Sequence, residues 1–413
     1  MKFECIYEDI NKALMSISKV NAKSSVFPII ELIHLEADDN MITFRSTNLE
    51  IILEISINAK VEIKGKIVIN YANISKITNI IKSDILKVEL IDNFLFIQSG
   101  KSKIKLQVSP DEDIPELPIS NINNSELNTN NLSINREVFI DIIKSVSFAV
   151  ANTDIKPEIS SVYMYNSNSY LYTVATDTFR LAENRINISN IDNKVNTLNK
   201  DNKNDSLNPE SKISIMLPGK SVIILLSILD SLNSEKIEIE NYDDGILISS
   251  SKNSSNTFIA IRTINGNFPD YKQLFPKDWS GIIILDKLAL ASNMSATMLF
   301  KDNYSYSNLS IKGNILYIKT NNNNIGSYES EIEIKNVPVD INNNSQNTNN
   351  NIQNTSNNSF EIEANYNSSL LLEGLSKIDG NIISIKFTSP NRPIFIKSEN
   401  NNDFVYVLMP LNR

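Results

Sequence analysis

The sequence predicts an α+β protein built from three similar domains. Six segments with helical periodicity begin near residues 8, 71, 136, 220, 286 and 368, and alternating strand-like runs lie between them. Two of the intervals are longer than the others, and each long interval holds one Asn-rich tract. Without these tracts the helices recur about every 65 residues. Six units of one helix and several strands therefore pair into three domains.

Each helical segment carries a stripe of apolar residues. In the first segment, Ile10, Leu14 and Ile17 fall at i, i+4 and i+7, which places them on one face. Pro218 suits the start of the fourth helix, and Asn367 can cap the sixth. The expected helices are roughly Glu8–Val20, Tyr71–Lys82, Arg136–Val150, Lys220–Leu229, Asp286–Met298 and Ser368–Ile378.

The intervals between the helices alternate apolar and polar residues, which is the period of a half-buried strand. The single histidine, His34, lies in such a stretch and is expected to be structural. The expected strands are Met41–Ser46, Glu50–Ala59, Glu62–Ile69, Phe94–Gln98, Lys103–Val108, Tyr163–Ala175, Lys236–Glu240, Thr257–Thr263, Asn314–Lys319 and Phe404–Met409.

Proline-containing linkers divide the repeat into domains. We expect domains at residues 1–122, 131–268 and 278–413, with linkers at Ser109–Leu132 and Phe268–Ser280. The Asn-rich tracts, at about 187–211 in the second domain and about 342–359 in the third, cannot bury enough surface to fold. They are expected to be surface loops inserted between strands.

The composition excludes several classes of function. With only one histidine and one cysteine, Cys5, the chain cannot form an internal disulfide, and a transition-metal site or a Ser-His triad is all but excluded. The N-terminus lacks the features of a signal peptide, and no apolar run is long enough to span a membrane, so we expect a cytoplasmic protein. The net charge of −9 argues against nucleic acid at long range, although a local basic lining can still hold phosphate.

Two motifs that suggest chemistry are weak. Leu217–Ser221 ends in Gly-Lys-Ser between a strand and a helix, but it lacks the first glycine of a phosphate-binding loop. Asp111, Glu112 and Asp113 lie in a linker rather than on converging strands, and Asp177 is typical of a turn. We expect no metal and no cofactor. A carboxylate- and metal-dependent nucleic-acid hydrolase remains the alternative from the enzyme class.

Several strings, in order along the whole chain, resemble one protein family. They are the initial MKF, VFPIIELIHLE, SGKSKIKLQ, TVATDTFRLA, NGNFPDYKQLFP, TSPNRPIFI and the final VYVLMPLNR. Together with the sixfold repeat, they make the chain similar to the bacterial sliding clamp, the beta subunit of DNA polymerase III. The resemblance implies the DNA-clamp fold: three similar domains, each with two helices packed on antiparallel sheets, in a head-to-tail dimeric ring. It also implies a bacterial, nucleoid-associated processivity factor without catalytic residues.

The resemblance implies three sets of partners: duplex DNA held without regard to sequence, a second copy of the chain, and the polymerase alpha subunit, the clamp loader and other proteins with a clamp-binding motif. Lys12, Lys19 and Lys23 form a stripe opposite the apolar face of the first helix. The expected DNA-facing residues are Lys12, Lys19, Lys23, Lys76, Arg136, Lys144 and Lys156. The expected dimer contacts are Ile77, Ile81 and Ile104 against the helix near Leu290.

The resemblance also implies an apolar pocket for short partner peptides with Leu and Phe anchors. Arg180 is expected to hold carbonyl or carboxylate groups of the peptide, whereas Leu181 and Leu408 can also be read as core residues. Thr178-Phe179 and Leu370 differ from the usual family residues, and so does the tail at Asn412-Arg413. The altered tail leaves an orphan scaffold, which kept the clamp fold but lost its partners, as a further alternative. The expected pocket residues are Ile159, Thr176, Thr178, Phe179, Arg180, Leu181, Pro269, Gln273, Leu274, Asn367, Leu370, Pro393, Val407, Leu408, Met409, Pro410 and Leu411.

Overall fold

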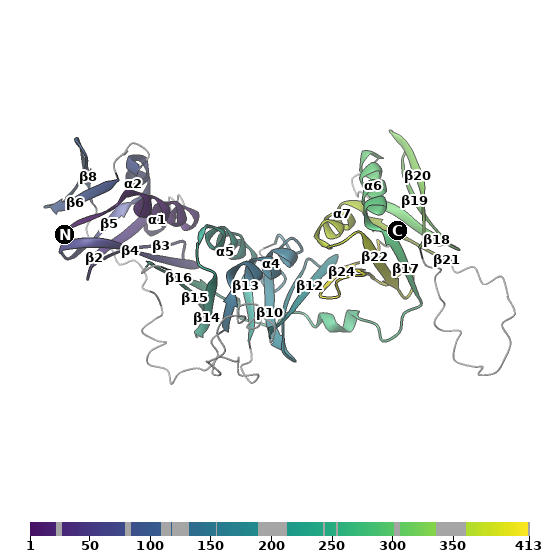
Figure 1. Cartoon of the computed structure of the whole chain (residues 1–413). Helices are drawn as coiled ribbons and strands as arrows, with labels where there is room; N and C mark the ends of the chain where they lie inside the picture. Colours follow the sequence, from purple (N-terminus) through teal and green to yellow (C-terminus); the bar gives the residue numbers. More distant parts are fainter. Residues whose placement is uncertain are drawn as a thin grey trace. The chain divides into compact units, whose positions relative to one another are not determined.

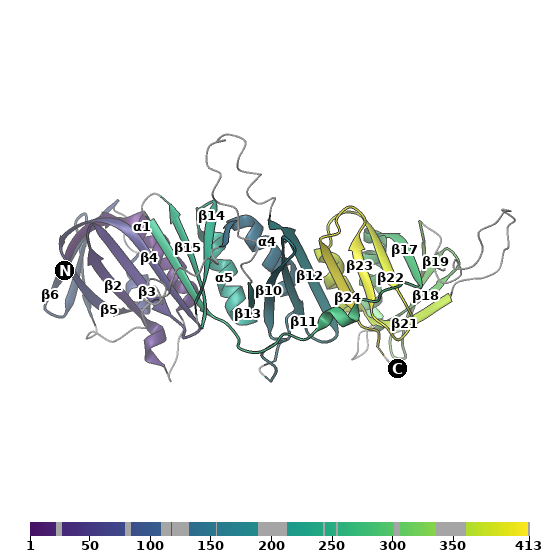
Figure 2. The same cartoon turned by 90° about the horizontal axis from the view of Figure 1, so that it is seen from below.

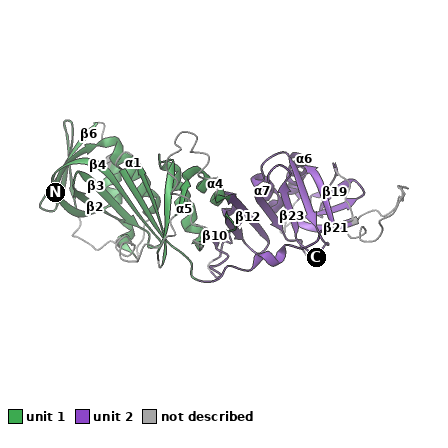
Figure 3. Ribbon diagram, turned by 60° about the horizontal axis from the view of Figure 1, so that its bottom comes forward, with its two compact units in different colours: residues 1–144, 164–170, 187–265 green, residues 145–163, 171–186, 266–413 purple. Residues whose placement is uncertain are grey.

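The described part of the chain forms two compact units. The computed structural model describes residues 1–21, 27–78, 84–108, 117, 132–153, 155–188, 213–242, 244–252, 255–300, 306–335 and 361–411. Unit 1 comprises residues 1–144, 164–170 and 187–265, and unit 2 comprises residues 145–163, 171–186 and 266–413 (Figure 3). The predicted Asn-rich loops lie outside the described residues, apart from residues 187 and 188.

Unit 1 is built on one long antiparallel sheet. β4 pairs with β1 on one side and with β16 on the other, so the N-terminal strands are continuous with strands from residues 236–262. In order, the strands are β8 (Ser102–Gln107), β7 (Phe94–Ser99), β6 (Ile85–Ile91), β1 (Lys2–Ile6), β4 (Ile51–Ile63), β16 (Ser255–Arg262), β15 (Gly245–Lys252), β14 (Lys236–Tyr242) and β9 (Leu132–Asn135). β3 (Met41–Thr47), β2 (Leu32–Asp38) and β5 (Gly65–Asn70) branch successively from β4.

The first helix of unit 1 packs on this sheet through its apolar face. α1 (Tyr7–Val20) buries Ile10, Leu14 and Ile17, as predicted, and contacts β3, β4 and α5. Figure 1 shows α1 and α5 on the same side of the strands. The remaining elements are α2 (Tyr71–Thr78), α4 (Arg136–Ser147), β13 (Ser214–Pro218), α5 (Gly219–Ser231) and a 3-10 turn, η1 (Pro28–Glu31). The last three residues of α4 fall in unit 2.

Unit 2 contains two antiparallel sheets and two adjacent helices. The larger sheet runs β11 (Tyr170–Thr176), β12 (Arg180–Asn187), β24 (Phe404–Leu408), β23 (Ile394–Ser398), β22 (Ile382–Phe387) and β17 (Gly281–Asp286). The smaller runs β20 (Gly326–Glu333), β19 (Ile315–Asn322), β18 (Tyr306–Lys312) and β21 (Glu361–Asn367). The C-terminal strand β24 lies between β12 and β23 and is buried along its length (Figure 2).

The two helices of unit 2 each begin after a capping side chain, of which only Asn367 was predicted. α6 (Lys287–Thr297) starts after Asp286, whose carboxylate accepts the Ala289 amide at 3.0 Å. α7 (Ser368–Lys377) starts after Asn367, whose side chain accepts the Leu370 amide at 3.1 Å, which confirms that predicted cap. Short 3-10 turns follow Asp270 and α6, as η3 (Tyr271–Leu274) and η4 (Met298–Phe300).

The structure confirms all six predicted helices, and it corrects two predicted strands. The second helix is described only as far as Thr78. The run Tyr163–Ala175 is a hairpin of β10 (Ser161–Ser167) and β11, because Asn168 and Ser169 both have positive φ and turn the chain. The predicted break before Glu62 is absent, since β4 continues to Ile63 and β5 starts at Gly65.

Candidate functional site

The most structured part of the predicted site is the loop between β11 and β12. Thr176 Oγ1 donates to the Arg180 carbonyl oxygen at 2.6 Å and accepts the Thr178 amide at 3.1 Å. Asp177 Oδ1 accepts the amides of Phe179 and Arg180, both at 3.0 Å, so Asp177 forms the turn as expected. Thr178 has the left-handed φ of 77°, and Phe179 is 59% exposed. The loop therefore exposes an aromatic side chain on a backbone whose amides, from Asp177 to Arg180, all donate hydrogen bonds.

The same loop occurs a second time, in unit 1, between β3 and β4. Thr47 Oγ1 donates to the Ile51 carbonyl oxygen at 2.8 Å and accepts the Leu49 amide at 2.9 Å. Asn48 Oδ1 accepts the amides of Glu50 and Ile51 at 3.0 and 2.7 Å. Leu49 has φ of 77°, the value found at Thr178. The two loops thus have the same hydrogen bonds and differ in their side chains. The exposed Phe179 and the buried Arg180 of unit 2 correspond to the exposed Glu50 and the buried Ile51 of unit 1.

Arg180 ties the unit 2 loop to its surroundings. Its guanidinium donates to Asp177 Oδ2 at 3.0 Å, to Glu373 Oε2 at 2.5 Å and to the Phe148 carbonyl oxygen at 2.8 Å. Its side chain is only 9% exposed. Burial by itself lowers the pKa of Arg180, but the hydrogen bond to Glu373 and the charges of Asp177 and Glu373 raise it overall. In this structure the guanidinium holds protein groups, so its contact with a partner stays a prediction.

The C-terminal segment lies beside this loop. In the β12–β24 pairing, Arg180 is opposite Leu408. The Met409 amide then donates to the Phe179 carbonyl oxygen at 2.9 Å, and the Leu411 amide donates to the Asn365 carbonyl oxygen at 2.7 Å. Leu408 is buried, whereas Met409 and Leu411 are half-buried. The end of the described chain is therefore fixed by backbone hydrogen bonds and keeps apolar side chains partly at the surface.

Helix α7 is joined to the same region through Tyr406. The Tyr406 hydroxyl donates to the Leu370 carbonyl oxygen at 2.7 Å, and burial raises the pKa of this phenol. The ring lies against Gly374, where an added Cβ would be 2.2 Å from it. Its centroid is also 5.9 Å from that of Phe148. Close packing with a glycine thus sets the position of α7 and of its half-buried Leu370.

The segment that contains the predicted pocket residues Gln273 and Leu274, η3, is held by other contacts. Phe275, which follows η3, packs its ring 4.9 Å from that of Phe395 on β23. Lys272 in η3 donates to Glu183 on β12 at 2.7 Å. Gln273 is exposed and donates to Asp270 at 2.7 Å.

The predicted pocket residues divide by exposure. The buried ones are Ile159, Thr176, Arg180, Leu181, Pro393, Val407 and Leu408. The half-buried ones are Asn367, Leu370, Met409, Pro410 and Leu411, and the exposed ones are Thr178, Phe179, Pro269, Gln273 and Leu274. The contacts above bring together the loop, the tail and α7, whereas the hydrogen bonds of Pro269 and Gln273 stay within residues 269–273. Leu181 and Leu408 lie in the core, which was the alternative reading for both.

The predicted DNA-facing cations have different environments. Lys12 is exposed and pairs with Glu8 at 2.6 Å, whereas Lys19 donates to the Ser227 carbonyl oxygen at 2.5 Å. Burial lowers the pKa of Lys19. Arg136 donates to the carbonyl oxygens of Leu229 and Ser234, both at 2.8 Å, and so caps the end of α5. Lys76, Lys144 and Lys156 are exposed, and Lys23 lies outside the described residues.

Two of the predicted dimer residues, Ile104 and Leu290, belong to β8 and to α6, which contacts β20, and β8 and β20 are edge strands of opposite charge. β8, with exposed Lys103 and Lys105, ends one sheet, and β20, with exposed Glu329 and Glu331, ends another. Ile104 is half-buried on β8. Leu290 is fully buried inside unit 2, so it presents no side chain at the surface. The backbone of α2 includes Ile77, and Ile81 is outside the described residues.

The sequence did not identify two residues of α7 that lie close to the loop, Glu373 and Lys377. Lys377 Nζ lies 5.7 Å from the centroid of the Phe148 ring, which Arg180 also approaches at 5.2 Å. An acid and a base four positions apart on a predicted helix were a usable signal. The link from Glu373 to Arg180 was not visible in the sequence, because 193 positions separate the two residues.

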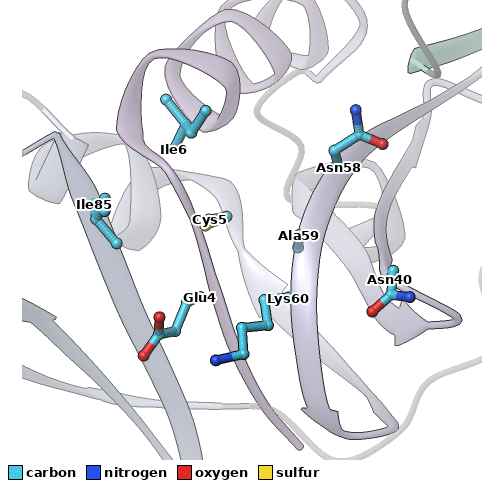
Figure 4. Close-up of a pocket in the computed structure, with 8 residues that line it drawn as sticks. All are labelled: Glu4, Cys5, Ile6, Asn40, Asn58, Ala59, Lys60 and Ile85. Carbon is cyan, nitrogen blue, oxygen red and sulfur yellow. The ribbon is translucent and has the colours of Figure 1, made fainter.

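Among the described residues, unit 1 has cavities at two places. One, of about 470 Å³, is lined by Cys5, Glu4 and Lys60 among others, and Figure 4 shows Glu4 and Lys60 side by side at its edge. The other, of about 540 Å³, lies between α1 and the end of α5 and is rich in serine. The described residues contain no group of three or more His, Cys, Asp and Glu side chains that could hold a metal ion. Within the same residues, no helix is long and apolar enough to cross a membrane.

Comparison with known proteins gives one consistent result. Three models of the DNA polymerase III beta subunit match in succession: the N-terminal domain at residues 1–118, the central domain at 133–270 and the C-terminal domain at 272–412. The beta sliding clamp of Bacillus subtilis is 21% identical, with 100% of this chain and 99% of that protein covered. The beta sliding clamp of Buchnera aphidicola is 24% identical, with both chains fully covered.

Solved structures agree on the fold. The crystal structure of the DNA polymerase III beta subunit from Pseudomonas aeruginosa superposes with a TM-score of 0.83 at 19% identity, covering all of both chains. The sliding clamp from Bacillus subtilis gives a TM-score of 0.81 at 21% identity, covering 100% of this chain and 99% of that one. The fold is therefore the three-domain α+β clamp fold. The chain belongs to the DNA polymerase III beta subunit, or beta sliding clamp, family, a family of non-catalytic subunits of DNA replication.

Proposed function

We propose that this protein is a DNA polymerase processivity factor, a dimeric ring that encloses duplex DNA and tethers the polymerase and other partners. The observation that carries the proposal is the succession of three domain matches over nearly the whole chain. A closed ring cannot leave DNA sideways, so a weakly bound polymerase stays on its template. Tethering of this kind requires no catalytic residue, in keeping with a non-catalytic family.

Ring closure is supported by the charges of the two edge strands. β8 and β20 each end a sheet, and unpaired edge strands are the surfaces through which sheets extend between chains. The exposed lysines of one and glutamates of the other would attract in a head-to-tail contact and repel in a contact between identical edges. The predicted interface residue Ile104 lies between Lys103 and Lys105 on the same strand.

Contact with DNA would rely on exposed cations rather than on the net charge of the chain. Lys12, Lys76, Lys144 and Lys156 are exposed and lie on or near the helices expected to face the duplex. Such residues attract phosphates without reading bases, and their effect weakens with salt. Arg136 is less suited to this role, because its guanidinium already donates to the carbonyl oxygens of Leu229 and Ser234.

Docking of partner segments would use the surface formed by Phe179, Leu370, Met409, Pro410 and Leu411, called here the docking surface. Its support is the rigid loop that exposes Phe179 and the backbone bond that fixes Met409 beside it. Apolar side chains on a fixed backbone suit Leu and Phe anchors, because little ordering cost remains at binding.

The proposal is tested by topology. The purified protein should have about twice its chain mass of 46.5 kDa and, with a clamp loader, should be retained on nicked circular DNA. Cutting the circle should release it, because a ring slides off a free end. Retention that does not depend on circularity, or a monomer that never becomes trapped, would contradict the proposal.

A further inference from the structure

Comparison of the two loops shows that Arg180 is not needed to build its loop. The unit 1 loop makes the same four side-chain-to-backbone hydrogen bonds with Ile51 at the corresponding position, and Ile51 is fully buried. An apolar residue therefore satisfies the fold there. A buried arginine needs compensating partners, and it is weak evidence for stability by itself. The charge at position 180 calls for another explanation.

The contact between Arg180 and Glu373 is suited to exchange. Of the two carboxylates that bind Arg180, Asp177 is part of the loop and has 18% of its side chain exposed. Glu373 lies on α7 and has 45% of its side chain exposed. An anion approaching from solvent therefore meets the Glu373 contact first. The Asp177 and Phe148 contacts can hold the guanidinium in place while its third partner changes.

α7 also offers Glu373 a second partner. Lys377 lies four residues further along the helix, and a Glu followed by a Lys at i+4 is the favourable order for a helical ion pair. In this structure Lys377 instead lies near the Phe148 ring. A rotation of the Glu373 side chain toward Lys377 would replace one ion pair by another and leave α7 and the loop unchanged.

We propose that Glu373 is an internal substitute for a carboxylate of the docking partner, which takes its place on Arg180. This inference rests on the proposed docking of partner segments and names the chemistry of one subsite: the C-terminal carboxylate of the partner segment, next to the apolar anchors. Glu373 then acts as a competitor that selects for partners able to replace it.

The test uses the full-length protein and two fluorescein-labelled peptides with the same Leu and Phe anchors. One ends directly after the Phe anchor in a free carboxylate, and the other ends in an amide. Fluorescence anisotropy gives both dissociation constants for the wild type, Glu373→Gln and Lys377→Ala.

Glu373→Gln removes the competing charge and should bind the free-acid peptide about 3- to 10-fold more tightly, with less than a twofold change for the amide. Lys377→Ala removes the receiving group and should weaken only the free-acid peptide.

The outcomes are separable. Equal effects of Glu373→Gln on both peptides, or none on either, would overturn the subsite while the docking proposal stands. A matched control, Asp379→Asn, removes an exposed carboxylate two residues beyond the end of α7 and should leave both affinities at the wild-type value. If neither peptide binds the wild type or any variant, the docking proposal itself fails, and the subsite fails with it.

Discussion

Arg180 and Ile51 occupy the same position in two copies of one hydrogen-bonded loop, and only Arg180 carries a charge. Both residues are buried and begin a strand that pairs with a later strand, β24 in unit 2 and β16 in unit 1. The residue before each accepts a backbone bond from the end of that strand: Met409 donates to Phe179, and Arg262 donates to Glu50 at 3.0 Å. A repeated backbone with different side chains allows loop stability and partner docking to be examined separately.

The two loops give a matched pair of variants. Asp177→Ala and Asn48→Ala each remove a side chain that accepts two backbone amides, and Asn48→Ala should therefore cost about 1–2 kcal/mol in the free energy of unfolding. Asp177→Ala also removes a partner of the buried Arg180 guanidinium, so it should cost at least as much. Only Asp177→Ala should weaken binding of an apolar-anchor peptide, by about tenfold, because only that loop positions Phe179. Urea denaturation and peptide anisotropy measure the two effects. A similar loss of binding in Asn48→Ala would show that the loss reflects stability.

The helices could be predicted because each carries a stripe of apolar residues, and some of them also begin at a cap that is local in sequence. Asn367 illustrates this: its side chain bonds to an amide three residues later, so the signal needs no knowledge of the fold. The hairpin at Asn168-Ser169 was missed because β10 and β11 together read as one continuous alternating run. Two adjacent polar residues carry the turn, and neither is glycine, so the usual turn signal was weak.

The site was predicted as a set of residues but not as an arrangement. Leu408 and Leu181 are apolar like Met409, and only the pairing of β12 with β24 decides that the first two are buried and the third is not. Arg180 was expected to face a partner, yet its hydrogen bonds reach Phe148 and Glu373, which are distant in sequence. Such long-range contacts depend on tertiary structure, which the local pattern does not encode.

The contact between Gly374 and Tyr406 predicts a strong stability effect. In Gly374→Ala the new methyl group would overlap the Tyr406 ring, which is enclosed in the core and holds the Leu370 carbonyl. Overpacking of this kind should lower the free energy of unfolding by about 1–3 kcal/mol, despite the better helix propensity of alanine. Thermal denaturation would measure it, with Ser376→Ala as a control on the exposed side of the helix. An unchanged or higher Tm would contradict the packing described here.

Cys5 predicts a dependence of stability on alkaline pH. Burial, with a smaller contribution from the charge of Asp9, raises the pKa of the Cys5 thiol to about 12. In the unfolded chain a thiol ionises near pH 8.5. The unfolded state therefore loses its proton first, so the contribution of Cys5 to stability is complete below about pH 8.5 and falls as the pH rises toward 12.

This effect can be isolated by difference. Urea midpoints of the wild type and of Cys5→Ala should fall by different amounts between pH 7.5 and pH 10, with the larger fall in the wild type. Other groups titrate in the same range, but they are common to both proteins and cancel. A thiol reagent such as DTNB should also react with native Cys5 far more slowly than with the urea-unfolded chain. Equal falls in the two midpoints would show that the thiol titrates alike in both states.

The opposite charges of β8 and β20 predict a pair of variants that restore each other. Lys103→Glu with Lys105→Glu makes both edges acidic, and Glu329→Lys with Glu331→Lys makes both edges basic. Each double variant alone should dissociate to monomers at concentrations at least about tenfold higher than the wild type, because like charges would face each other. An equimolar mixture should form dimers again, since both contacts of a head-to-tail ring between the two variants join an acidic edge to a basic one.

Light scattering after size-exclusion chromatography measures all three samples, and Lys277→Glu, an exposed linker change, serves as the control. Dimers in each separate variant, or monomers in the mixture, would exclude these strands as the closing edges.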